Sequence, residues 1–519
     1  MNNQYDVILI GSGIGALTAG NLLAKHGKNV MILEQHTVAG GYCTSYVRKG
    51  CLFDVPTIMT NMRKDDPIER LFAYLGVDKR LEFLEIHKLC RMVGPDLTLE
   101  WYADSHKLES EFIHKFPHEI HGLRRYFKTL RTLCLKMEQA HYQPTWLQKL
   151  SYPLFFSELI RYHNDTFSQF VNRFIKDETL KELLGTEAVT LALPASKVSA
   201  LYYIGMIMSY SRGGIWYPKG GFQKMTQAFV DCFTEAGGYL RLRSCVKKVI
   251  VENRKAIGVE LDTGEALYAP IVISNADTKK TFLDLIDPVH LKKKFVQKIR
   301  NLTPSYAGFA VKLGVKMPLN ELRRYAWLFH LSEYGSVEKM FTLAEQDITD
   351  FDNCSFSIDT SSLIQNEIDN NGVNVISLVV LPMSYRAMNT WRSANKKEYN
   401  ALKEDIADTL IKRAEIYIPG LSENIVIRDI STPLTYERYT SATYGAWYDT
   451  TATPAQSLTH KLGPRTPIKG LYLTGAKSIL GCGLVGAMFA GLYTADTLMK
   501  GKISNGRSVL RPELLEETI

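Results

Sequence analysis

The sequence predicts an α/β fold in which strands and helices alternate around a parallel sheet. Residues 5–34 read as strand, glycine turn, helix and strand, and residues 470–499 read as strand, glycine loop and helix. Between these segments, residues 222–274 read as a helix followed by strands. Such alternation is typical of a sheet covered by helices, because each helix returns the chain to the next parallel strand.

The first element is an apolar strand over residues 5–10, followed by glycines in the spacing G-x-G-x-x-A. Gly11 permits the tight turn, Gly13 lets the backbone approach a pyrophosphate, and Ala16 lets the helix lie against the strand. The following helix offers free N–H groups and a partial positive charge at its start. We expect the dinucleotide contacts of this turn to be Gly11, Ser12, Gly13, Ile14, Gly15 and Ala16.

Glu34 ends the second strand, over residues 29–34. A carboxylate at this position accepts hydrogen bonds from both ribose hydroxyls of a dinucleotide. It also repels a 2′-phosphate, which favours FAD or NAD over NADP. A structural βαβ unit that binds no ligand is the alternative interpretation.

Composition and charge exclude several classes of protein. The chain has 519 residues, 45% of them hydrophobic, and its net charge of +8 is too mild to indicate nucleic-acid binding. The longest apolar run, residues 200–210, is too short to span a membrane. The eight cysteines form no C-x-x-C pair, which favours a reduced, cytoplasmic protein without structural zinc. The chain enters its first strand at once, so we expect no signal peptide. From the sequence we assign no metal ligand and no catalytic side chain.

Gly40 and Gly41 follow the second strand and allow another close approach of the backbone. Their pattern, Leu-Glu-x5-Gly-Gly, resembles the FAD-binding extension of the flavoprotein amine oxidase and phytoene desaturase group. Residues 116–126 are similar to the matching segment of carotenoid isomerases and retinol saturases. Residues 213–277, which end in Ile-Ser-Asn-Ala-Asp, closely resemble the phytoene desaturase family.

This resemblance implies FAD as the cofactor and a discontinuous domain organisation. A Rossmann-like FAD-binding domain is expected over residues 1–100, 205–285 and 425–519, and an α+β substrate domain over residues 101–204 and 286–424. In the family, the residue at Val246 contacts the adenine end of FAD through its backbone. The further FAD contacts implied are Glu34, Gln35, Gly40, Gly41, Tyr42, Val246, Gly475, Gly483, Leu484 and Val485.

The remaining elements follow from local patterns. Residues 65–205 read mostly as helix, and residues 262–264 read as a hairpin turn. We expect a helix over 222–235 and strands over 239–251, 270–274, 307–315 and 373–381.

The C-terminal segment contains a strict G-x-G-x-x-G at Gly481, Gly483 and Gly486. Too few residues follow it to supply a second strand ending in an acid, so we expect no second nucleotide site. In related flavoproteins the N-terminus of this helix points at the pyrimidine edge of the flavin ring. The chain departs from the family at two positions: it has Pro56 where the family often has glycine, and Lys477 where the family often has an acid. Lys477 approaches the pyrophosphate or points to solvent.

The resemblance implies an FAD-dependent oxidoreductase or redox isomerase acting on C–C and C=C bonds of a long isoprenoid or polyene lipid. An amine oxidase-like flavoprotein and a lipid-binding flavoprotein without turnover are the alternatives. A substrate tunnel is expected from residues that are equally compatible with a core, namely Tyr202, Tyr203, Met206, Met208, Trp216 and Tyr217.

Two segments are compatible with peripheral contact to a membrane. Residues 144–163 combine aromatic, aliphatic and basic side chains, and residues 292–294 are three lysines. A buried helix pair and a solvated helix face are the respective alternatives. The expected location is cytoplasmic, and association with a membrane surface is a further hypothesis that rests on these two segments.

Overall fold

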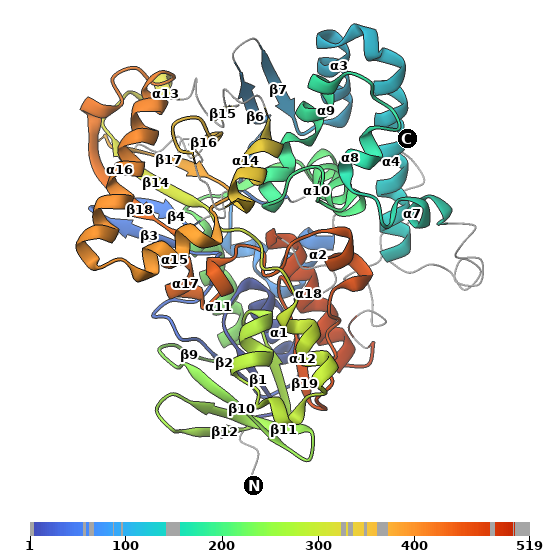
Figure 1. Cartoon of the computed structure of the whole chain (residues 1–519). Coiled ribbons are helices and arrows are strands. Elements are labelled where there is room, and N and C mark those ends of the chain that lie inside the picture. The colour runs from blue at the N-terminus through green and yellow to red at the C-terminus, as the bar shows by residue number, and fades with distance from the viewer. Residues whose placement is uncertain are drawn as a thin grey trace.

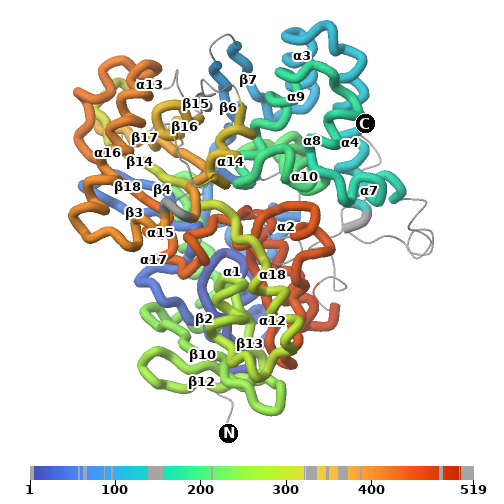
Figure 2. The backbone as a smooth tube through the Cα atoms, viewed as in Figure 1, coloured from blue at the N-terminus to red at the C-terminus, as the bar shows by residue number. Residues whose placement is uncertain are grey.

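The computed structural model shows a lower lobe and a broader upper region (Figure 1). Segments from the beginning, middle and end of the chain, drawn in blue, green and red, meet in the lower lobe (Figure 2). The structure describes the whole chain except residues 1–4, 56–58, 62–66, 87, 95–96, 142–155, 323–327, 331–335, 347–349, 361–371, 478–482, 502 and 504–519.

A five-stranded parallel sheet forms the centre of the lower lobe. Its order is β19-β13-β1-β2-β9, so strands from three distant parts of the chain lie side by side. The central strands are continuously buried, as expected for a parallel sheet covered on both faces. This sheet confirms the predicted α/β class. Its strands are β1 (Val7–Ile10), β2 (Val30–Leu33), β9 (Tyr239–Arg241), β13 (Ile271–Ser274) and β19 (Leu471–Leu473).

Alternate residues of the central strands serve two different cores. On β1, Val7 and Leu9 pack with helices, whereas Ile8 and Ile10 pack with a three-stranded antiparallel sheet. The period of two in a strand places these pairs on opposite faces. The covering elements are α1 (Ile14–Lys25), α11 (Phe222–Glu235) and α18 (Gly483–Leu498) on one face, and β10 (Val246–Glu252), β11 (Lys255–Leu261), β12 (Ala266–Tyr268) and α12 (Lys293–Arg300) on the other.

Helices α1 and α18 cross with their backbones in contact. A Cβ atom on Gly491 of α18 would lie 2.3 Å from the carbonyl oxygen of Gly15 in α1. A Cβ atom on Gly15 would in turn lie 2.9 Å from the carbonyl oxygen of Ala487. Only glycine fits at both positions, so the crossing ties the first helix of the chain to the last.

The strand predicted over residues 239–251 is two strands in two sheets. β9 pairs with β2 in the parallel sheet, whereas β10 pairs with β11. The break occurs because Arg243 adopts a positive φ of 52°, and the N–H groups of Arg243 and Ser244 donate to the carbonyls of His36 and Glu34. The prediction of one strand was therefore wrong at residues 242–245. The hairpin at residues 262–264 is confirmed by the pairing of β11 with β12.

A seven-stranded sheet dominates the upper region on the left of Figure 1, and α16 (Lys396–Glu415) packs on it. Its order is β18-β14-β17-β16-β15-β6-β7, with one parallel pair, β6 with β15. The two strands predicted over 307–315 and 373–381 are confirmed as β14 and β17. The strands are β6 (Lys88–Val93), β7 (Thr98–Tyr102), β14 (Phe309–Val315), β15 (Leu328–His330), β16 (Phe356–Asp359), β17 (Asn374–Val380) and β18 (Ile425–Ser431).

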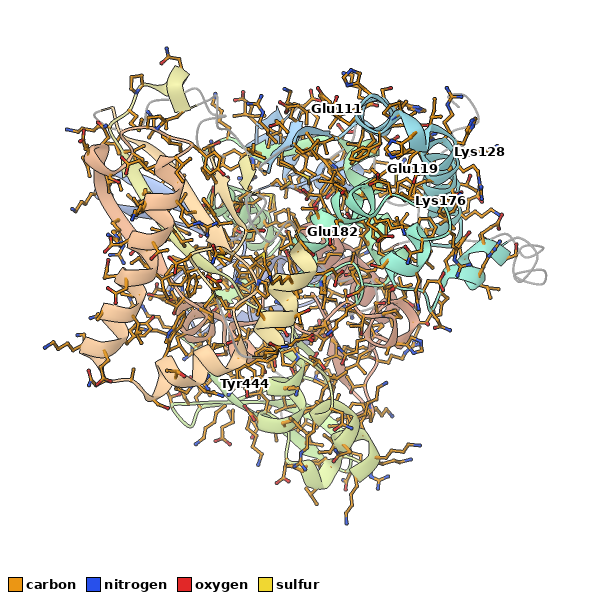
Figure 3. All side chains as sticks on the ribbon, turned by 45° about the horizontal axis from the view of Figure 1, so that its top comes forward. Glu111, Glu119, Lys128, Lys176, Glu182 and Tyr444 are labelled. Atoms are coloured by element: carbon orange, nitrogen blue, oxygen red, sulfur yellow. The ribbon has the colours of Figure 1, made fainter. Side chains whose placement is uncertain are left out.

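Helices fill the upper right of Figure 1. There the buried carboxylate of Glu119 accepts the backbone N–H groups of Lys176 and Asp177, both at 2.6 Å; Glu119 and Lys176 are labelled in Figure 3. The helices are α3 (Ser105–Lys115), α4 (Ile120–His141), α7 (Ser157–Tyr162), α8 (Phe167–Val171), α9 (Glu178–Gly185), α10 (Ala200–Gly213) and the short 3₁₀ helix η3 (Thr186–Leu191).

The prediction of mostly helix over residues 65–205 missed three strands. These are β5 (Phe83–Ile86), β6 and β7. β5 pairs with β8 (Ile215–Pro218), which lies far away in the sequence, whereas β6 pairs both with the remote β15 and with its neighbour β7. Smaller elements complete the fold: α2 (Pro67–Leu75), β3 (Ser45–Arg48), β4 (Cys51–Asp54), α13 (Leu319–Leu322), α14 (Val337–Glu345), α15 (Tyr385–Ser393) and α17 (Pro433–Thr440).

None of the helices in the described part of the chain has both the length and the apolar character needed to cross a bilayer. Of the stretch 144–163, residues 144–155 lie outside the described residues, and α7 covers most of the rest. The division into two domains stays a prediction. Near its boundaries, β6 pairs with β15 and α12 packs in the core beneath the parallel sheet.

The α1–α18 crossing predicts a large cost for one added methyl group. Gly491→Ala should lower the free energy of unfolding by about 1–3 kcal/mol, because the new Cβ forces the two backbones apart. The measurement is chemical denaturation followed by circular dichroism. Gly463→Ala is the control, since a Cβ there meets open space and should change stability by less than about 0.5 kcal/mol. Equal effects of the two variants would contradict the packing described here.

Candidate functional site

A cavity of about 1180 Å³ lies where strands of the parallel sheet end. Gly11 directly follows β1, Glu34 follows β2, Asn275 follows β13 and Gly475 lies two residues beyond β19, and all four line the cavity. Ligands of open α/β sheets bind at the carboxyl ends of the strands, where loops from several strands meet. The volume exceeds the range of about 300–1,000 Å³ typical of small-ligand pockets. The cavity therefore has room for a large ligand, or for two ligands together.

The first glycine turn presents bare backbone to this cavity. Gly11 has a φ of +84° and its N–H donates to the carbonyl of Leu33 at 2.7 Å. Gly13 caps the start of α1 and has no side chain to occupy the free N–H groups of the first turn. The amide of Asn275 lies so close that a Cβ on Gly13 would be 2.5 Å from it. Free N–H groups at a helix start form a site for a phosphate group.

The carboxylate of Glu34 holds this turn against the end of β2. Its Oε2 accepts the N–H and the hydroxyl of Ser12 at 2.8 and 2.6 Å, and its Oε1 accepts the N–H of His36 at 2.8 Å. An ionised carboxylate offers about four acceptor positions, so capacity for a ribose hydroxyl remains. The contact of Glu34 with a ribose therefore stays a prediction. Its structural role, which is to hold Ser12 and His36 in place, was not evident from the sequence.

The second glycine pair also contacts the first turn. The N–H of Gly40 donates to the Ser12 hydroxyl at 3.2 Å, and both Gly40 and Gly41 have positive φ. The hydroxyl of Tyr42 donates to the carbonyls of Gly445 and Ala446 at 3.0 Å, so this loop is tied to a distant segment. Backbone from residues 40–42 therefore forms a second wall of the cavity.

The start of α18 forms the third backbone wall. Gly483 has a φ of +73°, and a Cβ there would meet open space. Leu484 and Val485 also line the cavity. Gly481 and Pro56 lie outside the described residues, so the interpretation of the strict G-x-G-x-x-G and of the Pro56 departure stays a prediction.

All but one of the predicted cofactor contacts line this single cavity, including Gln35 and Val246. The exception is Ala16, which is fully buried and has no surface on the cavity wall. The assignment of the cavity-lining residues as FAD contacts stays a prediction.

Only two of the six residues expected in the substrate tunnel lie on the cavity wall. Tyr202 and Met206 do so, four residues apart on one face of α10. Tyr203 is fully buried instead and donates its hydroxyl to the carbonyl of Leu184 at 2.8 Å. Tyr217 is buried, and its hydroxyl donates to the carboxylate of Asp54 at 2.6 Å. Met208 and Trp216 also lie outside the wall. The core interpretation is therefore correct for Tyr203, Met208 and Tyr217, which are buried, whereas Trp216 is half-buried.

Lys312 is a site residue that the sequence prediction missed. It lies on β14, is 3% exposed and lines the cavity, and its ammonium donates to the carbonyl of Asp54. Burial lowers the pKa of Lys312 to about 8, although nearby carboxylates, Asp54 first, favour its charged form. The available signal was a single lysine inside the otherwise apolar strand Phe-Ala-Val-Lys-Leu-Gly-Val.

Lys477, at the position where the family often has an acid, does not point to solvent. It is 4% exposed, lines the cavity and donates to the carbonyl of Ala276. Burial lowers the pKa of Lys477 to about 8, although the nearby carboxylates of Asp449 and Asp277 favour its charged form. Burial also raises the pKa of Asp449 to about 6, although the N–H and hydroxyl of Thr278 donate to it at 2.7 Å. A cation and two carboxylates therefore share one edge of the cavity.

Disulfide bonds and clusters of metal-ligating side chains are not found in the described part of the chain. Its seven described cysteines form no disulfide bond with one another, and no group of three metal-ligating side chains occurs within these ranges. Desolvation raises the pKa of the buried Cys43 thiol to about 12, so this cysteine next to the second glycine pair is unreactive.

Comparisons with known proteins identify similar chains. Residues 17–499 match the family model described as flavin-containing amine oxidoreductase. The chain is 27% identical over 515 residues to prolycopene isomerase 1, chloroplastic, of an Oncidium hybrid cultivar, covering 95% of this chain and 83% of the relative. It is 23% identical over 535 residues to the all-trans-retinol 13,14-reductase of Macaca fascicularis, covering 96% and 86%. The solved structure of wild-type putrescine oxidase bound to putrescine has a TM-score of 0.62 at 16% identity, covering 96% and 99%, which shows a common fold.

The buried lysine of β14 predicts a pH dependence of stability. Between the pKa of about 8 in the folded protein and 10.5 in the unfolded chain, only the unfolded chain keeps the proton of Lys312. The free energy of unfolding of the wild type should therefore rise relative to that of Lys312→Met across this pH window, by about 2 kcal/mol between pH 8 and pH 10. Urea unfolding at pH 8 and pH 10 measures it. The control is Lys316→Met, because Lys316 is exposed just beyond the same strand; its stability should follow that of the wild type. Parallel curves of unfolding free energy against pH for Lys312→Met and the wild type would contradict the account.

Proposed function

The chain belongs to the flavin-containing amine oxidoreductase family, and we propose that it acts on C–C and C=C bonds of a long apolar isoprenoid or polyene lipid. It is an FAD-dependent oxidoreductase or redox isomerase. The family membership carries the cofactor assignment. The observation that carries the substrate proposal is one cavity that joins glycine-lined backbone to an apolar wall of the helical region.

We assign the FAD contacts to the backbone walls of this cavity. The turns at Gly11–Gly15 and Gly475 and the start of α1 supply N–H groups for the diphosphate. In this assignment Glu34 would hold the ribose, Val246 the adenine end and the start of α18 at Gly483 the ring system; all three line the cavity. When bound, FAD supplies the electron-pair chemistry that no side chain provides by itself.

The remaining wall orients an apolar chain and excludes water. Leu89, Met137, Leu159, Leu201 and Met206 contribute apolar surface from the seven-stranded sheet and the helices. Burial of apolar ligand surface against such walls stabilises the complex by about 25 cal/mol per Å² before the entropic costs of binding. The named relatives, a prolycopene isomerase and a retinol reductase, act on polyene lipids, which supports this substrate class.

We also propose peripheral contact with a membrane, from which such lipids are drawn. Lys292, Lys293 and Lys294 are exposed side by side at the start of α12, and the Ile160 side chain of α7 is 51% exposed. Basic and apolar side chains on a surface favour anionic bilayers.

The FAD site predicts a sharp effect of one side chain. Purified protein should be yellow with one FAD per chain, and Gly13→Val should lower FAD affinity by at least about tenfold, because no side chain fits between the turn and Asn275. Flavin absorbance per protein measures this. Gly463→Val is the control of equal size at an open position. Full flavin content in Gly13→Val would contradict the assignment.

The substrate class predicts the products. A polyene should lose two hydrogens to protein that carries oxidised FAD, gain two hydrogens from protein that carries reduced FAD, or give an isomer of unchanged mass, as seen by chromatography with mass detection. Consumption of an amine with release of peroxide, while polyenes stay unchanged, would support the amine oxidase-like alternative and contradict the proposal. Binding of the polyene without any product would support the non-catalytic alternative.

A further inference from the structure

One wall of the cavity carries a buried carboxyl group that the proposed function has not used. Glu187 lies on η3, is 5% exposed and lines the cavity. The wall of the helical region is apolar or weakly polar at Cys134, Met137, Leu159, Leu201 and Met206, and its other polar side chains, His163, Thr190, Tyr202, Ser209 and Tyr210, include no second carboxyl group. This wall belongs to the upper region, whereas α1 and α18, which begin at the glycine turns, lie in the lower lobe (Figure 1).

The carboxyl group of Glu187 has little internal support. Its Oε1 accepts from the Cys90 thiol at 3.2 Å, and within the described ranges no second hydrogen-bond donor reaches this carboxyl. A thiol is a weak donor. The adjacent Thr190 hydroxyl is directed to the Glu187 main-chain carbonyl and to the sulfur of Met206, at 2.6 and 3.3 Å.

Two other buried acids in the described part of the chain, Glu34 and Glu119, are better satisfied. Glu34 accepts three hydrogen bonds, and Glu119 accepts two from backbone N–H groups. Buried polar groups in folded proteins are normally paired, so a poorly paired carboxyl on a cavity wall indicates a partner that the cavity receives.

The charge state of Glu187 limits the chemistry of that partner. Desolvation raises the pKa of Glu187 to about 7, so near neutral pH the group is present both as a donor and as an acceptor. A ligand hydroxyl can pair with either form, because it both donates and accepts. An ammonium group requires the ionised form, and a ligand carboxylate requires the protonated one.

We propose that Glu187 anchors the terminal hydroxyl of an otherwise apolar chain, so that the substrate is a polyene alcohol. This inference rests on the proposed function and names the substrate class within it. Glu187 then determines specificity by leaving a buried acid unpaired whenever a hydrocarbon of the same shape is bound.

The test compares two ligands that differ in one group, all-trans-retinol and its deoxy analogue with hydrogen in place of the hydroxyl. FAD-loaded wild type should bind retinol at least about tenfold more tightly, by quenching of tryptophan fluorescence. Glu187→Leu should bind the two equally, and Glu187→Gln should keep most of the preference. Glu182→Gln is the matched control, since Glu182 is an exposed residue of α9 (Figure 3) and does not line the cavity; it should behave as wild type.

An infrared measurement keeps the test valid if Glu187→Leu does not retain FAD. Retinol should shift the carboxyl stretching band of Glu187 in the wild type, the deoxy analogue should not, and the band should be missing in Glu187→Gln. An unchanged preference in Glu187→Leu, or a band that retinol does not shift, would overturn the anchor alone. Failure of the wild type to bind either ligand would overturn both the anchor and the proposed substrate class.

Discussion

The close approach of backbones at the ends of β1, β13 and β19 is the constraint on which the rest of the structure depends. A Cβ on Gly475 would lie 2.2 Å from the Asn275 side chain, and one on Gly15 would lie 2.9 Å from Gly475. These contacts join residues from the beginning, middle and end of the chain. The two long intervening stretches must therefore leave the lower lobe and return to it, and they build the upper region that closes the cavity. The same bare backbones leave N–H groups free for a diphosphate.

Burial acts on the charged groups of the cavity in one consistent direction. It lowers the pKa of Lys312 and Lys477 and raises the pKa of Asp449 and Glu187, so each group is shifted toward its neutral form. Such shifts indicate a poorly hydrated interior. An interior of this kind suits an apolar substrate, and it makes each polar contact inside it a strong determinant of what is bound.

The sequence was sufficient for the parts of the fold that local patterns encode. The turn at Gly11–Gly15, the acid Glu34 and the α/β class were predicted, because spacing and strand periodicity are local. The strand β5 was missed because its partner, β8, is remote in sequence, whereas β6 and β7 form a local antiparallel pair that the prediction of helix overlooked. Lys312 carried a readable signal, a lone lysine in an apolar strand. Glu187 carried none, because only the three-dimensional cavity separates it from the many exposed acids of the helical region.

The most direct test of the central claim, that one cavity receives both FAD and the lipid, is an experimental structure of the FAD-loaded protein with a bound polyene. The account predicts the diphosphate against the turns at Gly11 and Gly475 and the polyene beside Tyr202 and Met206, in contact with the flavin ring. A polyene bound elsewhere, or a diphosphate away from both turns, would contradict it.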